Sequence, residues 1–180
     1  MDRPRRMMFV DGENFTIRAQ ELAKEHSSDT IGDMHHPDVC FWSSWIEGNL
    51  STGGGQELIQ AIDARRYYYT CMTSDRPGID RVRDDLVERG FTPVVIQKVR
   101  GKRAKGVDIT LTKDMLVHAF FDNYDFAVLI AGDGDYVPLV EEVKRFGKRV
   151  YVVFFDEQHG LNPELRRAAD RFVLLQPSFK

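Results

Sequence analysis

The stretch Phe126-Ala-Val-Leu-Ile-Ala-Gly-Asp-Gly-Asp135 ends a run of apolar residues with two aspartates that a single glycine separates. The apolar run predicts a strand buried on both faces, which is typical of a parallel sheet. In open parallel sheets, ligand sites lie beyond the carboxyl ends of the strands. We therefore expect Asp133 and Asp135 to lie at the functional edge of such a sheet.

On either side of this stretch, short β-rich segments alternate with segments of helical period. The alternation predicts an α/β fold of three layers, with a central, mostly parallel sheet of about six strands and helices on both faces. Helices are expected at Arg76–Arg89, which Gly90 ends, and at Ile109–Phe121. Another is expected to start at Asp135-Tyr-Val-Pro138, with Asp135 as its cap, and to end at Gly147. The predicted strands are Met7–Asp11, Arg66–Thr73, Thr92–Val99, Phe126–Ala131, Arg149–Phe155 and Arg171–Leu175.

The chain as a whole has the size of one domain, because 180 residues with 42% hydrophobic side chains can bury one core. Its 25 Lys and Arg against 28 Asp and Glu give a net charge of -3, so no overall positive field indicates nucleic acid. The first ten residues lack the apolar run of a secretory signal, and no segment has membrane-spanning length, which predicts a cytoplasmic protein without a membrane partner. Cys40 and Cys71 form no Cys-x-x-Cys pair, which favours reducing surroundings.

Residues 26–56 show no clear periodicity, and we interpret them as an insertion or long loop within a single domain that covers residues 1–180. They include Cys40-Phe-Trp-Ser-Ser-Trp-Ile46 and the flexible Ser51-Thr-Gly-Gly-Gly55. A segment of this length in a compact domain often covers a site or contacts a partner. Its role is left open.

Two further aspartates are expected at the same edge of the sheet. Asp11 directly follows an apolar segment, and Asp108 starts a helix that follows a parallel strand. Two like charges about 4 Å apart repel by roughly 4 kcal/mol at an effective dielectric of about 20, so a cluster of four acids needs a cation. Oxygen ligands without Cys or His favour Mg²⁺ or Mn²⁺. We expect one or two such ions, which activate water for phosphodiester hydrolysis.

Each of these aspartates also has an ordinary structural explanation. Asp11 and Asp108 suit turns or caps, and Asp135 suits a helix cap; for any one of them alone, that explanation is preferred. Taken together the four favour an ion-binding site, and this hypothesis depends on acidic side chains from distant segments meeting in one pocket. Asp114 is treated as a surface residue or as support for the site, because six residues beyond Asp108 is about 600° of helix rotation.

Three motifs resemble the NYN domains of bacterial LabA-like proteins, a group of PIN-like nucleases. They are Phe9-Val-Asp-Gly-Glu-Asn14, Lys105-Gly-Val-Asp-Ile-Thr-Leu-Thr-Lys-Asp-Met115 and Ala131-Gly-Asp-Gly-Asp-Tyr-Val-Pro-Leu-Val140, and they span most of the chain. The resemblance implies a Rossmann-like PIN fold, RNA as the substrate class and a polar helper at Asn14. It implies metal ligands at Asp11, Asp108, Asp133 and Asp135. Residues 26–56 fit the family pattern least well.

A basic segment precedes Asp108 and is the candidate surface for nucleic acid, with single-stranded RNA the expected partner. Such contacts position a strand without reading its sequence and weaken as salt rises. A solvated basic loop explains the segment equally well. Its five cations are Lys98, Arg100, Lys102, Arg103 and Lys105.

Other residues that resemble ligand-binding groups have simpler explanations. The consecutive tyrosines 67–69 and the tryptophans at 42 and 45 can stack bases, but alternating strand residues usually serve the core, where we expect the tyrosines. His35, His36 and Cys40 lack a fourth zinc ligand at suitable spacing, and we expect loop histidines there.

Three competing interpretations fit parts of the pattern. An apolar strand that ends in Asp-Gly-Asp is also typical of haloacid-dehalogenase phosphatases, but those need a long downstream region and only 45 residues follow Asp135 here. Toprim domains share the motif but carry a glutamate on the first strand, which Asp11 does not match. A non-catalytic module that binds RNA or protein on the same fold is the other alternative. The sequence favours a metal-dependent nuclease, and it leaves open RNA against DNA, endo- against exonuclease action and the oligomeric state.

Overall fold

A single parallel sheet forms the centre of the computed structural model, which describes residues 3–28, 31–98 and 106–178. Its six strands are all parallel and lie in the order β5-β4-β1-β6-β7-β8. All six predicted strands are confirmed, and only their ends differ by a few residues. The strands are β1 Arg5–Asp11, β4 Ile62–Met72, β5 Thr92–Gln97, β6 Phe126–Ile130, β7 Arg149–Phe154 and β8 Arg171–Leu174.

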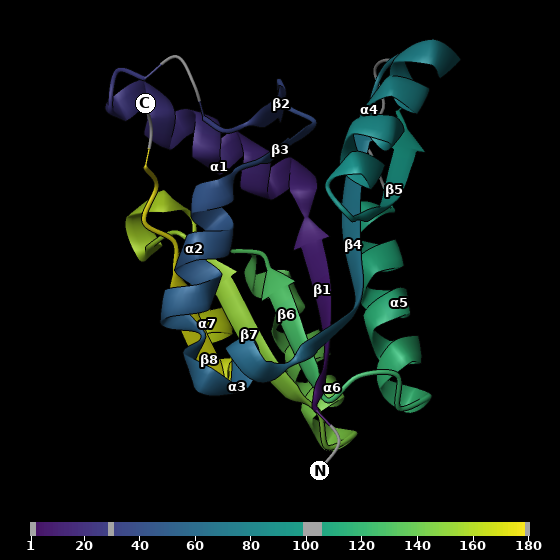
Figure 1. The fold of residues 1–180 in the computed structure, drawn as a ribbon, viewed down its shortest axis with the longest axis vertical. Coiled ribbons are helices and arrows are strands. Elements are labelled where there is room, and N and C mark those ends of the chain that lie inside the picture. Colours follow the sequence, from purple (N-terminus) through teal and green to yellow (C-terminus); the bar gives the residue numbers. More distant parts are fainter. Residues whose placement is uncertain (1–2, 29–30, 99–105, 179–180) are drawn as a thin grey trace.

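Helices cover both faces of this sheet, as the alternation of segments predicted. α1 packs against β1 and β4 and α4 against β5, whereas α5, α6 and α7 contact one another in a row. In Figure 1 the strands run together through the centre, with α5 to one side and α2 (Ser44–Gly53) to the other. The helices between the sheet strands are α1 Gly12–Glu25, α4 Arg76–Glu88, α5 Val107–Phe120, α6 Val137–Arg145 and α7 Pro163–Ala168.

The strand order reverses its direction between β1 and β6. From β1 the chain continues to β4 and β5 on one side, and from β6 it continues to β7 and β8 on the other. Such a switch point leaves a crevice beyond the carboxyl ends of the two central strands, where open α/β sheets bind ligands. Every residue of β6 is buried and apolar. Asp133 is the first charged residue after this strand.

Residues 31–60 are more regular than the predicted insertion or long loop. They form a small hairpin of β2 Met34–His36 and β3 Cys40–Trp42, followed by α2 Ser44–Gly53 and α3 Gly55–Gln60. The prediction that His35 and His36 lie in a loop is wrong, since both residues belong to β2. Phe41 is fully buried against Phe15, with ring centroids 4.6 Å apart, and α2 packs against β8. Residues 31–60 therefore contribute to the core. Strands of three residues are too short to show a period in the sequence.

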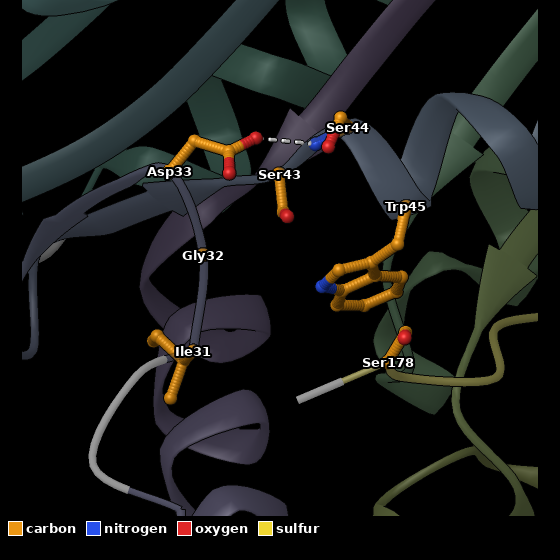
Figure 2. A pocket seen from close by; sticks show the side chains of 7 residues that line it. All are labelled: Ile31, Gly32, Asp33, Ser43, Ser44, Trp45 and Ser178. Carbon is orange, nitrogen blue, oxygen red and sulfur yellow. Dashed lines mark hydrogen bonds between the residues drawn. The ribbon is translucent and has the colours of Figure 1, made fainter. Parts of the chain in front are cut away.

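A cavity of about 250 Å³ lies where the insertion meets the C-terminal segment (Figure 2). The Ser43 hydroxyl and the indole of Trp45 point into it, and the carboxylate of Asp33 accepts a hydrogen bond of 2.7 Å from the backbone N–H of Ser44. Ser178 closes the side opposite Ile31. The insertion thus packs against both α1 and the end of the chain.

Two predicted helix starts need correction, while two predicted ends are confirmed. Asp135 does not cap a helix: Asp133 caps the short 3₁₀ turn Gly134–Tyr136 by accepting from the N–H of Asp135, and α6 begins after it. α5 begins two residues earlier than predicted, which puts Asp108 in its first turn. Gly90 and Gly147 follow α4 and α6 with φ of 77° and 75°, the left-handed conformation that suits glycine. No helix in the described part of the chain combines the length and apolar character that crossing a bilayer requires.

Candidate active site

Three of the four predicted aspartates line one cavity of about 310 Å³ at the switch point of the sheet. Asp11 is the last residue of β1, Asp133 follows β6, and Asp108 lies in the first turn of α5. Parallel strands and the helix that leads back to the next strand bring these distant residues to one edge. The cavity is lined by Asp11, Glu13, Asn14, Ile17, Arg18, Glu21, Asp108 and Asp133.

The hydroxyl of Tyr136 connects two of these carboxylates. It lies 3.1 Å from Oδ2 of Asp11 and 3.3 Å from Oδ1 of Asp108, and the tyrosine itself is buried. A phenol has one proton to donate, so it can satisfy one carboxylate at a time while it keeps both nearby. Burial and these two acids raise the pKa of Tyr136 well above its ordinary value, so it stays a donor.

Asp11 carries most of the electrostatic cost of this arrangement. Its side chain is 4% exposed. Burial and, next, the charge of Asp108 raise the pKa of Asp11 to about 7, although the hydrogen bond from Tyr136 acts in the opposite direction. Burying a carboxylate without a cation is unfavourable. A cation in the cavity would remove that cost.

The donor set fits a hard divalent cation, although its members are not gathered around one point. Carboxylate and amide oxygens suit Mg²⁺ and Mn²⁺, and the cavity leaves room for the waters that Mg²⁺ retains. Within residues 3–28, 31–98 and 106–178, no three His, Cys, Asp or Glu side chains form a group that holds a metal ion as they stand. Tyr136 bridges the carboxylates of Asp11 and Asp108.

The remaining predicted site residues fall into two groups. Asn14, in the first turn of α1, lines the cavity. Asp135 is exposed, as Asp133 is, but unlike Asp133 it is not among the described residues that line the cavity. Asp114 also lies outside the lining, where its carboxylate accepts a hydrogen bond of 3.1 Å from the Tyr69 hydroxyl.

The predicted nucleic-acid surface is described only at Lys98. Its ammonium group pairs with Glu13, and the Cys71 thiol donates to the same carboxylate at 2.7 Å. Burial acts against the charge, but the contacts with Glu13 and Cys71 outweigh it and raise the pKa of Lys98. Lys98 therefore has a charged partner in this structure. Arg100, Lys102, Arg103 and Lys105 lie outside the described residues.

The sequence did not predict several residues that line or contact the cavity. Tyr136 directly follows the Asp133-Gly-Asp135 motif. A phenol next to an acidic motif is the one feature of the sequence that could have indicated its contact with the carboxylates. Arg18 and Glu21 lie one and two turns beyond Asn14 on α1, so helical spacing from Asn14 predicts them. The tyrosines of β4 are buried in the core as expected, with exposed fractions of 0–8%.

Comparisons with known proteins agree with this fold. A family model described as the NYN domain matches residues 5–176. The crystal structure of VPA0982, a protein of unknown function from Vibrio parahaemolyticus, aligns over 99% of this chain and 98% of that chain, with a TM-score of 0.68 and 21% sequence identity. At that identity the likeness concerns the fold alone. No curated protein matches the chain.

Proposed function

The chain belongs to the NYN domain family of PIN-like nucleases, whose model covers almost its whole length, and we propose that it is a metal-dependent nuclease that hydrolyses phosphodiester bonds in RNA. Family membership supports nuclease chemistry on nucleic acid, and PIN-like nucleases usually use divalent metals. The dependence of this chain on Mg²⁺ or Mn²⁺, its RNA substrate and its site residues are the parts that we propose.

One observation carries the proposal. Asp11, Asp108 and Asp133 come from three separate segments of the chain and line a single cavity at the switch point of the sheet. The structural explanation of each aspartate as an isolated cap or turn does not account for a buried Asp11 whose pKa Asp108 helps to raise. A buried carboxylate whose cost is only partly offset, such as Asp11, is typical of a position where a ligand binds.

The residues of the cavity have separate parts in the proposed reaction. Asp11, Asp108 and Asp133 would hold the cation through carboxylate oxygens, and the Tyr136 hydroxyl contacts two of these carboxylates. The chemistry that a bound cation supplies is activation of water and neutralisation of charge on the phosphate. Asn14 lines the same cavity, and we assign its amide to orient water or a phosphate oxygen. Asp135 lies outside the lining, so we assign it a supporting role through water.

Cleavage assays test the proposal directly. Single-stranded RNA and DNA of the same sequence are incubated with the protein in Mg²⁺, Mn²⁺ or chelator. We expect cleavage of RNA with either metal and none in chelator. Asp133→Asn is expected to lower the rate by roughly 100-fold or more, since loss of a residue that merely supports a metal ligand costs about 10–100-fold.

The matched control is Asp114→Asn, which makes the same chemical change on α5 outside the cavity. It should retain activity within a few-fold of wild type, and circular dichroism should show both variants folded. Equal cleavage by Asp133→Asn and wild type, or cleavage that persists in chelator, contradicts the mechanism. Strand binding without cleavage in any metal supports the non-catalytic alternative instead.

A further inference from the structure

Among the described residues that line the carboxylate cavity of Asp11, Asp108 and Asp133, Arg18 is the one Lys or Arg. α1 brings it there, because Asn14, Arg18 and Glu21 are spaced four and three residues apart and share a face of the helix. The other charged residues of the lining are all acids. A polyanionic strand that approaches this cavity meets mostly negative charge, so the position of its single described cation matters.

The guanidinium group of Arg18 is held from two sides. Its Nη1 lies 2.7 Å from Oε2 of Glu21. On another side, the backbone of Gly160 lies so close that a Cβ there would come within 2.6 Å of Nε of Arg18. Gly160 has a φ of 98°, a conformation that other residues rarely adopt. The loop after β7 is therefore packed against the arginine side chain, which limits its freedom before any ligand arrives.

That loop is joined to the turn that carries Asp133. The backbone N–H of Asn162 donates to the carbonyl of Gly132 at 2.8 Å. A Cβ at Gly132 would lie 2.5 Å from the carbonyl oxygen of Gly160. Arg18 is thus braced by the same piece of chain that positions an acid of the site. Arginine fixed in this way loses little conformational freedom when it binds a phosphate through its forked N–H groups.

We propose that Arg18, oriented by Glu21 and Gly160, forms a phosphate-binding subsite that contacts the backbone phosphate next to the one at the aspartates. This inference rests on the proposed function, because it takes the ligand to be a nucleic-acid strand. Lys98 is less suited to the task, since it does not line the cavity. Because Arg18 contacts phosphate, it increases the affinity for the strand and fixes the position of the strand without any preference for base sequence.

Strand binding in chelator tests the subsite without any chemistry. A fluorescein-labelled single-stranded RNA is titrated with wild type, Arg18→Ala and Arg18→Lys, and anisotropy gives Kd at several salt concentrations. We expect Arg18→Ala to weaken binding about tenfold and to reduce the slope of log Kd against log salt by roughly one. Arg18→Lys should restore the slope and recover only part of the affinity, because lysine lacks the forked geometry.

The matched control is Arg145→Ala. Arg145 forms the same kind of pair, with Glu142 three residues before it at 2.8 Å, but on α6 and outside the lining of the cavity. It should change Kd less than about twofold and leave the salt slope as it is. Equal losses in both alanine variants, an unchanged slope in Arg18→Ala, or no strand binding by wild type would each overturn the subsite.

Failure of this inference and failure of the proposed function are distinguishable. A protein that cleaves RNA with Mg²⁺ while Arg18→Ala keeps the wild-type KM and salt slope retains the function and loses the subsite. A protein that binds the strand through Arg18 but cleaves nothing in any metal retains the subsite and loses the function. With cleavage present, Arg18→Ala is expected to raise KM more than it lowers kcat.

Discussion

The side chain of Asp11 illustrates how folding and the proposed chemistry oppose each other at a single residue. It is 4% exposed, and Asp108 adds like charge to the cost of burial. Tyr136 supplies one hydrogen bond of 3.1 Å. One neutral donor compensates only part of the desolvation of a carboxylate. A residue placed for stability alone would be neutral here.

Asp11→Asn is therefore expected to stabilise the metal-free protein. The amide removes the repulsion with Asp108 and still accepts the hydrogen bond from Tyr136, so the free energy of unfolding in chelator should rise by roughly 1–3 kcal/mol. Urea unfolding of both proteins in chelator measures the change. Asp114→Asn is the control, and it should not stabilise, because that carboxylate is hydrogen-bonded to Tyr69 outside the cavity. A clear loss of stability in Asp11→Asn contradicts the view of Asp11 as a residue kept for binding.

For single residues, the sequence predicted the acids of the site but not the side chains that contact them. Strand ends and a helix start predicted that Asp11, Asp108 and Asp133 meet, because the carboxyl ends of parallel strands share an edge. The contact of Tyr136 with Asp11 joins residues 125 positions apart, and no local pattern carries such a pairing. Asp135 could not be separated from Asp133 in the sequence, since the direction of each side chain depends on the 3₁₀ turn between β6 and α6.

The beginnings of the two central strands are joined by one ion pair. Asp125, directly before β6, accepts from the backbone N–H of Arg5 at 2.6 Å and from its guanidinium at 2.9 Å. This hydrogen bonding by Arg5 lowers the pKa of Asp125. Both side chains are 41% exposed, so the interaction is modest. It fixes the end of the β1–β6 pair opposite the carboxylate cavity.

Asp125→Asn is expected to destabilise the protein near neutral pH and to lose this effect in acid. A carboxyl whose pKa is lowered by folding stabilises the fold above its ordinary pKa of 3.8, and the contribution disappears as pH falls through the lowered folded value. Near pH 7 we expect a loss of about 0.5–1 kcal/mol and a Tm lower by roughly 1–4 °C. Well below the ordinary pKa, the two melting temperatures should converge.

Thermal melts of both proteins at several pH values measure the convergence. Asp84→Asn, an exposed carboxylate on α4, is the control and should melt with wild type throughout. A difference between Asp125→Asn and wild type that stays constant down to the lowest pH would contradict the ion-pair explanation. Such a constant difference would mean that the lost stability comes from the hydrogen bond between the backbone N–H of Arg5 and Asp125.

The elements that the sequence did not predict are stabilised mainly by contacts with segments far away in the chain. β2 and β3 have three residues each, too few for a period of two to be recognised. α2 contains Gly48 and ends at Gly53, both poor helix formers, and it gains its stability by packing on β8 near the far end of the chain. Phe41 is fixed against Phe15 only once α1 exists. The long strands and α5, by contrast, carry their pattern within their own residues.

For the whole molecule, the order of the strands is what makes the site. The sequence predicted six strands but could not give the order β5-β4-β1-β6-β7-β8, because strand pairing depends on contacts between distant segments. That order places β1 beside β6 and so brings Asp11 and Asp133 together. Asp108 arrives through α5, which packs on β1 and β4. The cavity therefore exists only in the folded chain.

A cation that binds this cavity must consequently stabilise the whole fold. An ion that binds the folded state and not the unfolded state adds about 2.7 kcal/mol at one hundred times its Kd, which corresponds to a rise in Tm of roughly 5–10 °C for a chain of this size. We expect Mg²⁺ and Mn²⁺ to raise the Tm in thermal melts. Asp133→Asn should abolish most of that rise while keeping the wild-type Tm in chelator within a few degrees.

Asp135→Asn is the informative comparison for this shift. Its side chain is exposed outside the cavity lining, so the variant should retain most of the metal-dependent rise in Tm. Equal loss in Asp133→Asn and Asp135→Asn would show that both acids bind the ion directly, and that the turn between β6 and α6 rearranges when the ion enters. No rise in wild type at any metal concentration would remove the cation from the proposal, because three segments that close around an ion cannot bind it without gaining stability.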